Sequence, residues 1–154
     1  MTASTPPAPP RVNLGVLASL IGFRLRMAQL AVYEDFLGDA PGPRLTPGNA
    51  GIIILIEANP EMTQQQLCEA IRIDKSTFAI TLNRLAERGL VRRVKSRKDR
   101  RQNMLRLTKK GAAMHAAILT HVERHERRVF ARLSGAEQKR LMALLKKVGQ
   151  PQRT

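Results

Sequence analysis

Polar residues of the kinds that bind DNA gather in one short segment, which begins at Asp74 and ends at Gly89. Its apolar residues Phe78, Leu82 and Leu85 are spaced three and four apart, which predicts a helix capped by Asp74 and stopped by the glycine. The opposite face carries Lys75, Ser76, Thr77, Asn83 and Arg84. Serine and threonine bond bases or phosphates, asparagine pairs with adenine, and arginine binds guanine or phosphate. We therefore predict that this face contacts the major groove of duplex DNA.

A dense run of cations follows this helix. Residues 92–110 hold ten Lys and Arg and one acid, Asp99, in a chain of 154 residues with a net charge of +15. Alternating apolar residues over 90–95 and 103–107 predict two strands joined by a basic tip at 96–101. Such a run is either a solvated surface loop or is held against phosphate, and arginines at a hairpin tip suit a narrow minor groove. The tip residues assigned to DNA contact are Arg97, Lys98, Asp99, Arg100 and Arg101.

Two more helices are predicted before the DNA-reading helix. Thr46, with Pro47 at the first helical position, begins one that ends at Asn59. Thr63 and Gln66 form a capping box that begins a short helix. Its expected inner face is Leu67, Cys68, Ala70 and Ile71. Two short helices and a basic hairpin, in this order, make a winged helix-turn-helix, so the expected fold class is mainly α with a two-stranded β wing.

Longer predicted helices flank this unit. The first runs from Asn13 to about Leu37 and carries apolar residues on more than one face, which a single domain of this size rarely covers. Thr108 caps another that continues to about Leu133, and the capping box Ser134–Glu137 begins the last. The first of these two helices carries the apolar residues Ala112, Ala113, Ala116, Leu119, Val122 and Phe130. The expected inward residues of the last are Leu141, Leu144, Leu145 and Val148. The excess of apolar faces predicts a partner subunit.

The expected organisation has four parts. They are a disordered Pro-rich tail at 1–12, a dimerisation helix and loop at 13–45, the winged DNA-binding domain at 46–110, and C-terminal dimerisation helices at 111–150.

Composition excludes several other functions. No apolar run approaches the roughly 20 residues of a membrane span, and residues 1–10 have no features of a secretory signal. One cysteine excludes an internal disulfide framework, and 3% aromatic residues make a base-stacking surface improbable. The chain has no phosphate loop, nucleophile elbow or H-E-x-x-H motif, so we expect no enzyme activity and no cofactor. We expect a bacterial cytoplasmic protein associated with the nucleoid.

A resemblance sharpens this interpretation. Asp99-Arg100-Arg101, Leu107-Thr108 and Gly111 match the D-x-R-x(5)-L-T-x-x-G wing signature of the MarR family of bacterial transcription regulators. The segments Asp74–Thr77 and Glu87–Leu90 resemble that family's recognition helix and its exit. The resemblance implies a homodimer that binds a pseudo-palindromic operator, usually as a repressor released by a small molecule.

The resemblance also implies residue roles. Asp99 would pair with a wing arginine and hold the shape of the wing, while Arg101 or Arg100 would enter the minor groove. At Ile80 relatives often carry arginine, so an apolar contact, for instance to a thymine methyl group, replaces a polar one here. The effector is expected to be a small acidic or aromatic ligand, such as an aromatic acid or its CoA thioester, bound near Arg24, Arg26 and Tyr33; these two arginines can equally face solvent.

Other functions are compatible with the same residues. An interaction module would use the winged fold to bind protein, with the basic wing facing an acidic surface. A non-specific architectural DNA-binding protein would use the same basic wing on the DNA backbone alone. A thiol-responsive regulator would act through Cys68, although its position beside Leu67 favours a small buried hydrophobe. His121 and His125 have the four-residue spacing of metal ligands but no matched third ligand, so no metal is predicted.

Overall fold

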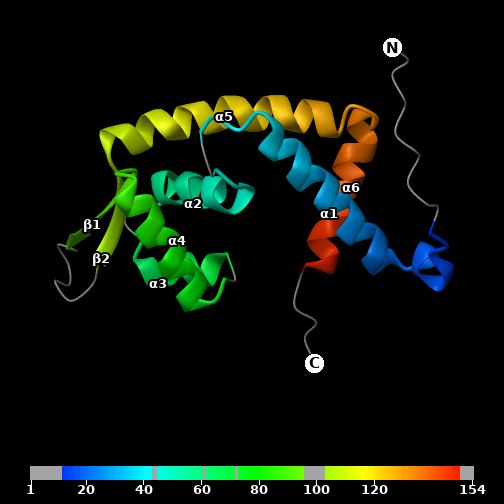
Figure 1. The fold of residues 1–154 in the computed structure, drawn as a ribbon, viewed down its shortest axis with the longest axis horizontal. Coiled ribbons are helices and arrows are strands. Elements are labelled where there is room, and N and C mark those ends of the chain that lie inside the picture. The colour runs from blue at the N-terminus through cyan, green and yellow to red at the C-terminus, as the bar shows by residue number, and fades with distance from the viewer. Residues whose placement is uncertain (1–11, 43–44, 61, 72, 96–102, 150–154) are drawn as a thin grey trace, which may run out of the picture.

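The computed structural model describes residues 12–42, 45–60, 62–71, 73–95 and 103–149. In chain order its elements are a 3-10 helix η1 (Gly15–Ser19), α1 (Ile21–Gly38), α2 (Pro47–Ala58), α3 (Gln64–Ala70), α4 (Lys75–Glu87), β1 (Val91–Lys95), β2 (Asn103–Leu107), α5 (Lys109–Val129) and α6 (Gly135–Val148). The molecule is elongated: α5 spans its length, the strands and α2 to α4 lie under one end, and α1 and α6 lie at the other (Figure 1). The predicted fold class, mainly α with a two-stranded wing, is confirmed.

Side-chain caps begin five of the described helices where the sequence predicts them. In each, an oxygen accepts a hydrogen bond from the backbone N–H three residues on: Thr46 from Asn49, Thr63 from Gln66, Asp74 from Thr77, Thr108 from Gly111 and Ser134 from Glu137. The first turn of a helix leaves amides without partners, and a cap satisfies one of them using residues adjacent in sequence. Local chemistry alone therefore fixes these starting points.

The first predicted helix is not continuous. The expectation of one helix from Asn13 to about Leu37 is wrong, because η1 ends at Ser19 and Leu20 has extended backbone with φ −80° and ψ 122°. The Ser19 hydroxyl donates to the Val16 carbonyl at 2.9 Å, and Arg24 Nε donates to the Ala18 carbonyl at 3.0 Å. These side chains satisfy carbonyls that a continuing helix would otherwise use, which permits the break.

The hydrophobic core lies within the winged part of the chain. It joins α2, α3, α4, the strands and α5 through Leu45, Ile52, Ile53, Ile56, Leu67, Phe78, Leu82, Leu85, Leu105 and Ile118, all of which are buried. The inward residues predicted for α4 are confirmed, as are Leu67 and Cys68 on α3. Ala70 on the same helix is exposed, which corrects its predicted inward position. The core thus holds α4 by one side and leaves the other side open.

The apolar residues that the sequence places on α5 are covered only in part, since Val122 packs against the core and is half-buried. Leu119 is 47% exposed, and the buried residues of this helix are Gly111, Ile118, His121 and His125. Helix α6 contains no buried residue. Of its predicted inward residues, Leu141 is half-buried, while Leu144, Leu145 and Val148 are exposed in this single chain. The sequence pattern identifies the apolar faces of these helices. It does not predict which of those faces are buried within a single chain. None of the helices in the described ranges is both long enough and apolar enough to cross a bilayer.

Polar contacts join the end of α1 to the C-terminal half of α5. His125 Nδ1 donates to Asp35 at 2.8 Å, and the Arg128 guanidinium donates to the same carboxylate at 2.8 Å. His121 is fully buried, and its Nε2 donates to the Phe36 carbonyl at 3.0 Å. A carbonyl only accepts hydrogen bonds, so this contact fixes the proton of a neutral His121 on Nε2. Both histidines pack edge-on against the Phe36 ring.

Two glycines set the path of the chain around the wing. Gly89 has φ +68°, a left-handed conformation that lets the chain turn from α4 into β1. A Cβ on Gly111 would lie 2.0 Å from the Leu90 carbonyl oxygen, so α5 packs directly against the entry to β1. Thr108 completes the junction, because its hydroxyl donates to the Gly89 carbonyl at 2.6 Å.

Candidate nucleic-acid interface

The outward side of α4 presents all five residues that the sequence assigned to the major groove. Lys75, Ser76 and Thr77 lie in its first turn, Asn83 and Arg84 lie two turns later, and all are exposed. Phe78, Leu82 and Leu85 hold the opposite side in the core. A helix held in this way can present its exposed side chains to a groove without rearrangement of the core.

Hydrogen bonds at the start of α4 limit what Ser76 offers. Its hydroxyl donates to Asp74 at 2.5 Å, and the Thr77 N–H donates to the same carboxylate oxygen at 2.8 Å. These hydrogen bonds from Ser76 and Thr77 hold the pKa of Asp74 well below its usual range. Asp74 therefore stays ionised and capped, and Ser76 offers an acceptor oxygen more readily than a donor.

Arg93 binds Asn83, a contact that the sequence does not predict. Arg93 Nη2, on β1, donates to the Asn83 side-chain oxygen at 2.7 Å. A guanidinium only donates, so the amide oxygen must face Arg93 and the amide nitrogen is turned away from it. The bidentate pairing with adenine expected for Asn83 would have to share or displace this hydrogen bond. No sequence signal could have identified the contact, because it depends on how β1 packs beside α4.

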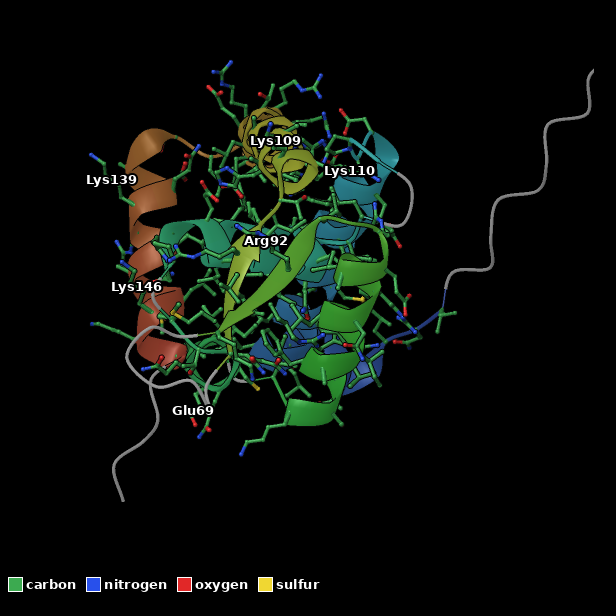
Figure 2. The ribbon with its side chains drawn as sticks, turned by 90° about the vertical axis from the view of Figure 1, so that its left-hand side faces the viewer. Glu69, Arg92, Lys109, Lys110, Lys139 and Lys146 are labelled. Carbon is green, nitrogen blue, oxygen red and sulfur yellow. The ribbon has the colours of Figure 1, made fainter. Side chains whose placement is uncertain are left out.

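The wing is described only at its base. Val91 pairs with Leu107 and Lys95 with Asn103 in the antiparallel sheet, which confirms the two predicted strands. The predicted DNA-contacting tip, Arg97 to Arg101, lies outside the described residues, and so does its Asp99. Viewed from this end, the molecule has Arg92, Lys109 and Lys110 around the wing base, with Lys139 and Lys146 along α6 to one side (Figure 2). The Lys110 ammonium donates to the Arg88 carbonyl at 2.9 Å.

A cavity of about 900 Å³ borders the inner edge of α4. It is lined by Leu37 from α1, Thr46 and Asn49 at the start of α2, and Thr81, Arg84, Leu85, Glu87 and Arg88 at the end of α4. Two of these residues are cationic, and one of them, Arg84, also belongs to the face assigned to DNA. The sequence could not locate this cavity, since its walls come from three separated segments.

The residues predicted to bind an effector do not come together in one protomer. Arg24 is tied to the Ala18 carbonyl, while Arg26 and Tyr33 are exposed. At about 100° per residue, Arg26 and Tyr33 share a face of α1, and Arg24 lies on roughly the opposite face. None of the three is among the residues that line the cavities of about 220, 180 and 900 Å³.

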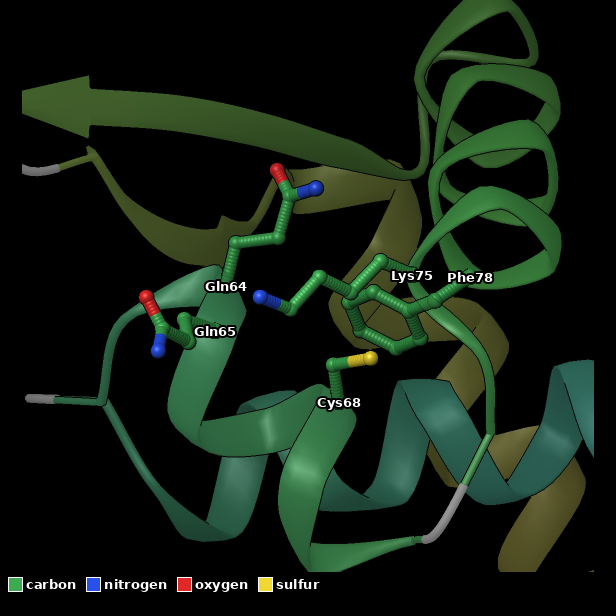
Figure 3. Close-up of a pocket in the computed structure, with 5 residues that line it drawn as sticks. All are labelled: Gln64, Gln65, Cys68, Lys75 and Phe78. Atoms are coloured by element: carbon green, nitrogen blue, oxygen red, sulfur yellow. The ribbon is translucent and has the colours of Figure 1, made fainter.

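Cys68 lies beside a small cavity of about 220 Å³ between α3 and α4, lined also by Gln64, Gln65, Lys75 and Phe78 (Figure 3). The side chain is buried, and its thiol donates to the Ile73 carbonyl at 3.0 Å. This environment is that of a small, hydrogen-bonded core residue. His121 and His125 are likewise engaged in the α1–α5 contacts, and the described residues contain no group of three or more possible metal ligands.

Comparisons with known proteins agree with this geometry. A model of the MarR family matches residues 44–102, which span α2 to the wing. A Thauera aromatica protein, whose name assigns it to transcriptional regulation of the hcr operon, is 36% identical over 135 residues, covering 87% of this chain and 81% of the relative. These matches extend well beyond the wing signature.

Solved structures match over nearly the whole chain. The transcriptional repressor CouR bound to a 23-mer DNA duplex has a TM-score of 0.84 at 34% identity, covering 92% of this chain and all of that one. CouR bound to p-coumaroyl-CoA has a TM-score of 0.82 at 33% identity, and the match covers 91% of this chain and 99% of that one. PcaV from Streptomyces coelicolor, in complex with its natural ligand, has a TM-score of 0.79 at 26% identity, and the match covers 90% of this chain and 96% of that one. The chain belongs to the MarR family of transcriptional regulators.

Proposed function

We propose that this protein is a dimeric transcriptional repressor that binds a pseudo-palindromic DNA operator and is released from it by a small acidic or aromatic ligand. The observation that carries the proposal is the exposed polar face of α4 beside a basic wing. A face on a helix of this width suits the major groove, and the basic hairpin beside it suits the flanking backbone and minor groove. The similarity to CouR bound to a DNA duplex supports the same interpretation.

Uncovered apolar surface supports the homodimer. No residue of η1 or α6 is buried in the single chain, and only Phe36 is buried in α1. These elements expose Val16, Leu17, Ile21, Leu25, Met142, Leu144, Leu145 and Val148. An apolar surface of this extent marks an interface, and a second copy would cover the same surface symmetrically. We therefore assign dimerisation to 13–45 and 111–150 and DNA reading to 46–110.

The cavity at the end of α4 supports the ligand response. Arg84 and Arg88 line it and would attract a carboxylate or phosphate. A ligand held there would contact a residue of the DNA-facing helix, so its binding energy can differ between the DNA-bound and free conformations. CouR, similar in fold and sequence, has been solved with p-coumaroyl-CoA. Arg24, Arg26 and Tyr33 remain a second candidate set, which two subunits together could form.

Operator binding tests the proposal directly. Duplexes bound by the full-length protein are selected from a random pool, and the affinity for the selected sequence is compared with that for random duplex, while light scattering gives the mass of the complex. We expect a dimer that prefers its operator by at least about 10³. Equal affinity for both duplexes would favour the architectural alternative, and no binding at low salt would overturn DNA binding altogether.

Ligand release is tested separately. Aromatic acids and their CoA thioesters are screened by thermal shift, and compounds that bind are tested for displacement of the protein from its operator. Arg88→Ala probes the α4 cavity, and Arg26→Ala probes the α1 set. We expect a displacing compound to lose affinity for one of these variants and keep it for the other. A compound that binds but leaves the operator complex intact is not the effector.

A further inference from the structure

Ile80 is an apolar residue on the polar side of α4. It is 53% exposed, whereas the other large apolar residues of this helix, Phe78, Leu82 and Leu85, are at most 1% exposed. The core therefore does not use Ile80. A branched aliphatic side chain in this position offers neither a donor nor an acceptor to water or to a base.

Helix geometry places Ile80 in the middle of the face assigned to DNA. Residues three and four apart are neighbours on a helix surface, so Ile80 lies between Ser76 and Thr77 on one side and Asn83 and Arg84 on the other. If these four reach base edges, Ile80 reaches them too. It therefore belongs to the surface that becomes desolvated when α4 enters the groove.

The proposed dimer surface does not account for this exposure. The uncovered apolar surface of η1, the first half of α1 and α6 lies at the end of the molecule away from α4 (Figure 1). A second copy seated there leaves Ile80 open to solvent. Single exposed aliphatic residues are common, so exposure alone assigns no role. The position among four polar residues of a DNA-reading face is what separates Ile80 from such cases.

The major groove offers one apolar group to such a residue. Base edges there present hydrogen-bond donors and acceptors, except for the 5-methyl group of thymine. An isoleucine pressed against a donor or acceptor would bury that group without a partner, which is unfavourable. Against a thymine methyl group, the same burial is favourable on both sides.

We propose that Ile80 is a specificity-determining residue that contacts the 5-methyl group of a thymine in each operator half-site. This inference rests on the proposed function, because it requires that α4 lies in the major groove. It adds a chemical requirement to the operator, namely an apolar group on the base at the centre of the α4 footprint.

The test removes the methyl group from the DNA and the side chain from the protein independently. Each thymine of the selected operator is replaced by uracil, symmetrically in both half-sites, and the Kd of the full-length dimer is measured. We expect one symmetric pair to weaken binding by roughly fourfold per half-site, the value of one buried methyl group. With Ile80→Ala, the loss at that pair should disappear, and with Ile80→Val it should largely remain.

Thr77→Ala is the matched control, since threonine also carries a methyl group that can contact thymine. This variant should bind more weakly overall and keep the uracil effect. Replacing the same thymine by 5-methylcytosine, compared with cytosine, should recover part of the affinity in wild type and none in Ile80→Ala. Unchanged thermal unfolding of Ile80→Ala, expected for an exposed position, excludes misfolding as the cause.

The outcomes separate this inference from the function on which it rests. If uracil weakens binding equally in wild type and Ile80→Ala, the role of Ile80 is overturned while operator binding stands. The same holds if the uracil effect is lost in Thr77→Ala and not in Ile80→Ala. Failure of the wild-type protein to prefer any duplex overturns the proposed function and this inference together.

Discussion

Asp35 carries the ionic link between the end of α1 and α5. Hydrogen bonds from Arg128 and His125 lower the pKa of Asp35 from 3.8 to about 2. A folded-state pKa below the unfolded value adds stability above the unfolded pKa, and that stability is lost as pH falls toward the folded value. The link is therefore complete at neutral pH and breaks between about pH 4 and pH 2.

Asp35→Asn should accordingly flatten the acid dependence of stability. We expect the variant to be less stable than wild type at pH 7, because His125 and Arg128 lose their charged acceptor, and the difference to shrink as pH falls from 4 to 2. Urea unfolding at a series of pH values measures this difference in the free energy of unfolding between the variant and wild type. Glu34→Gln, at the exposed neighbouring position, should follow the wild-type curve. Parallel curves for wild type and Asp35→Asn would remove Asp35 from this account.

The contact between Arg93 and Asn83 predicts a coupling between wing and recognition helix. Arg93→Ala removes the hydrogen bond that orients the Asn83 amide. Operator affinity should therefore fall, and the loss should be much smaller when Asn83 is already alanine. A double-mutant cycle on operator Kd should give a coupling of about 1 kcal/mol or more. Additive effects would show that Arg93 acts on DNA independently, for example through a phosphate.

At the scale of elements, Gly111 joins α5 to the wing. A Cβ there would meet the Leu90 carbonyl oxygen at 2.0 Å, and neither backbone segment can move without disturbing the strand pairing or the Thr108 cap. We expect Gly111→Ala to destabilise the protein by about 2–4 kcal/mol, in the range of severe overpacking. Gly51→Ala is the control: its Cβ meets open space within α2, so stability should be unchanged or rise by up to about 1 kcal/mol. Thermal unfolding compares the two.

The parts of the fold that could be predicted from the sequence are those fixed by residues close together in the chain. Caps such as Thr63 and Ser134 were predictable because the bonding groups are neighbours in sequence. The break at Leu20 and the buried face of α5 were not, because they depend on competing side-chain bonds and on which apolar face the chain covers by itself. On α4, the three- and four-residue spacing of the apolar residues predicted which side of the helix is buried and which is exposed. The Arg93 contact and the cavity at Arg84 required the packing of separate segments.

At the scale of the whole molecule, charge should govern DNA affinity. If six to ten phosphates are neutralised, operator affinity should fall by roughly 10³ to 10⁵ between 50 and 200 mM salt. Arg101→Ala should weaken operator binding and reduce this salt dependence, while the mass of the dimer in solution stays the same. Gel-shift titration and light scattering measure the two properties. Unchanged affinity of Arg101→Ala would falsify the assignment of the wing to DNA.

The absence of any buried residue in α6 has a consequence for the abundance of the protein. A lone amphipathic helix of 14 residues is marginal in water, so α6 gains its order largely from the second copy. Folding and association are then one equilibrium, and the midpoint of thermal unfolding should rise with protein concentration. In a cell holding few copies, the chains would spend more time with frayed ends open to proteases. Low expression would then shorten the lifetime of each molecule, and the amount of active regulator would fall faster than the amount synthesised.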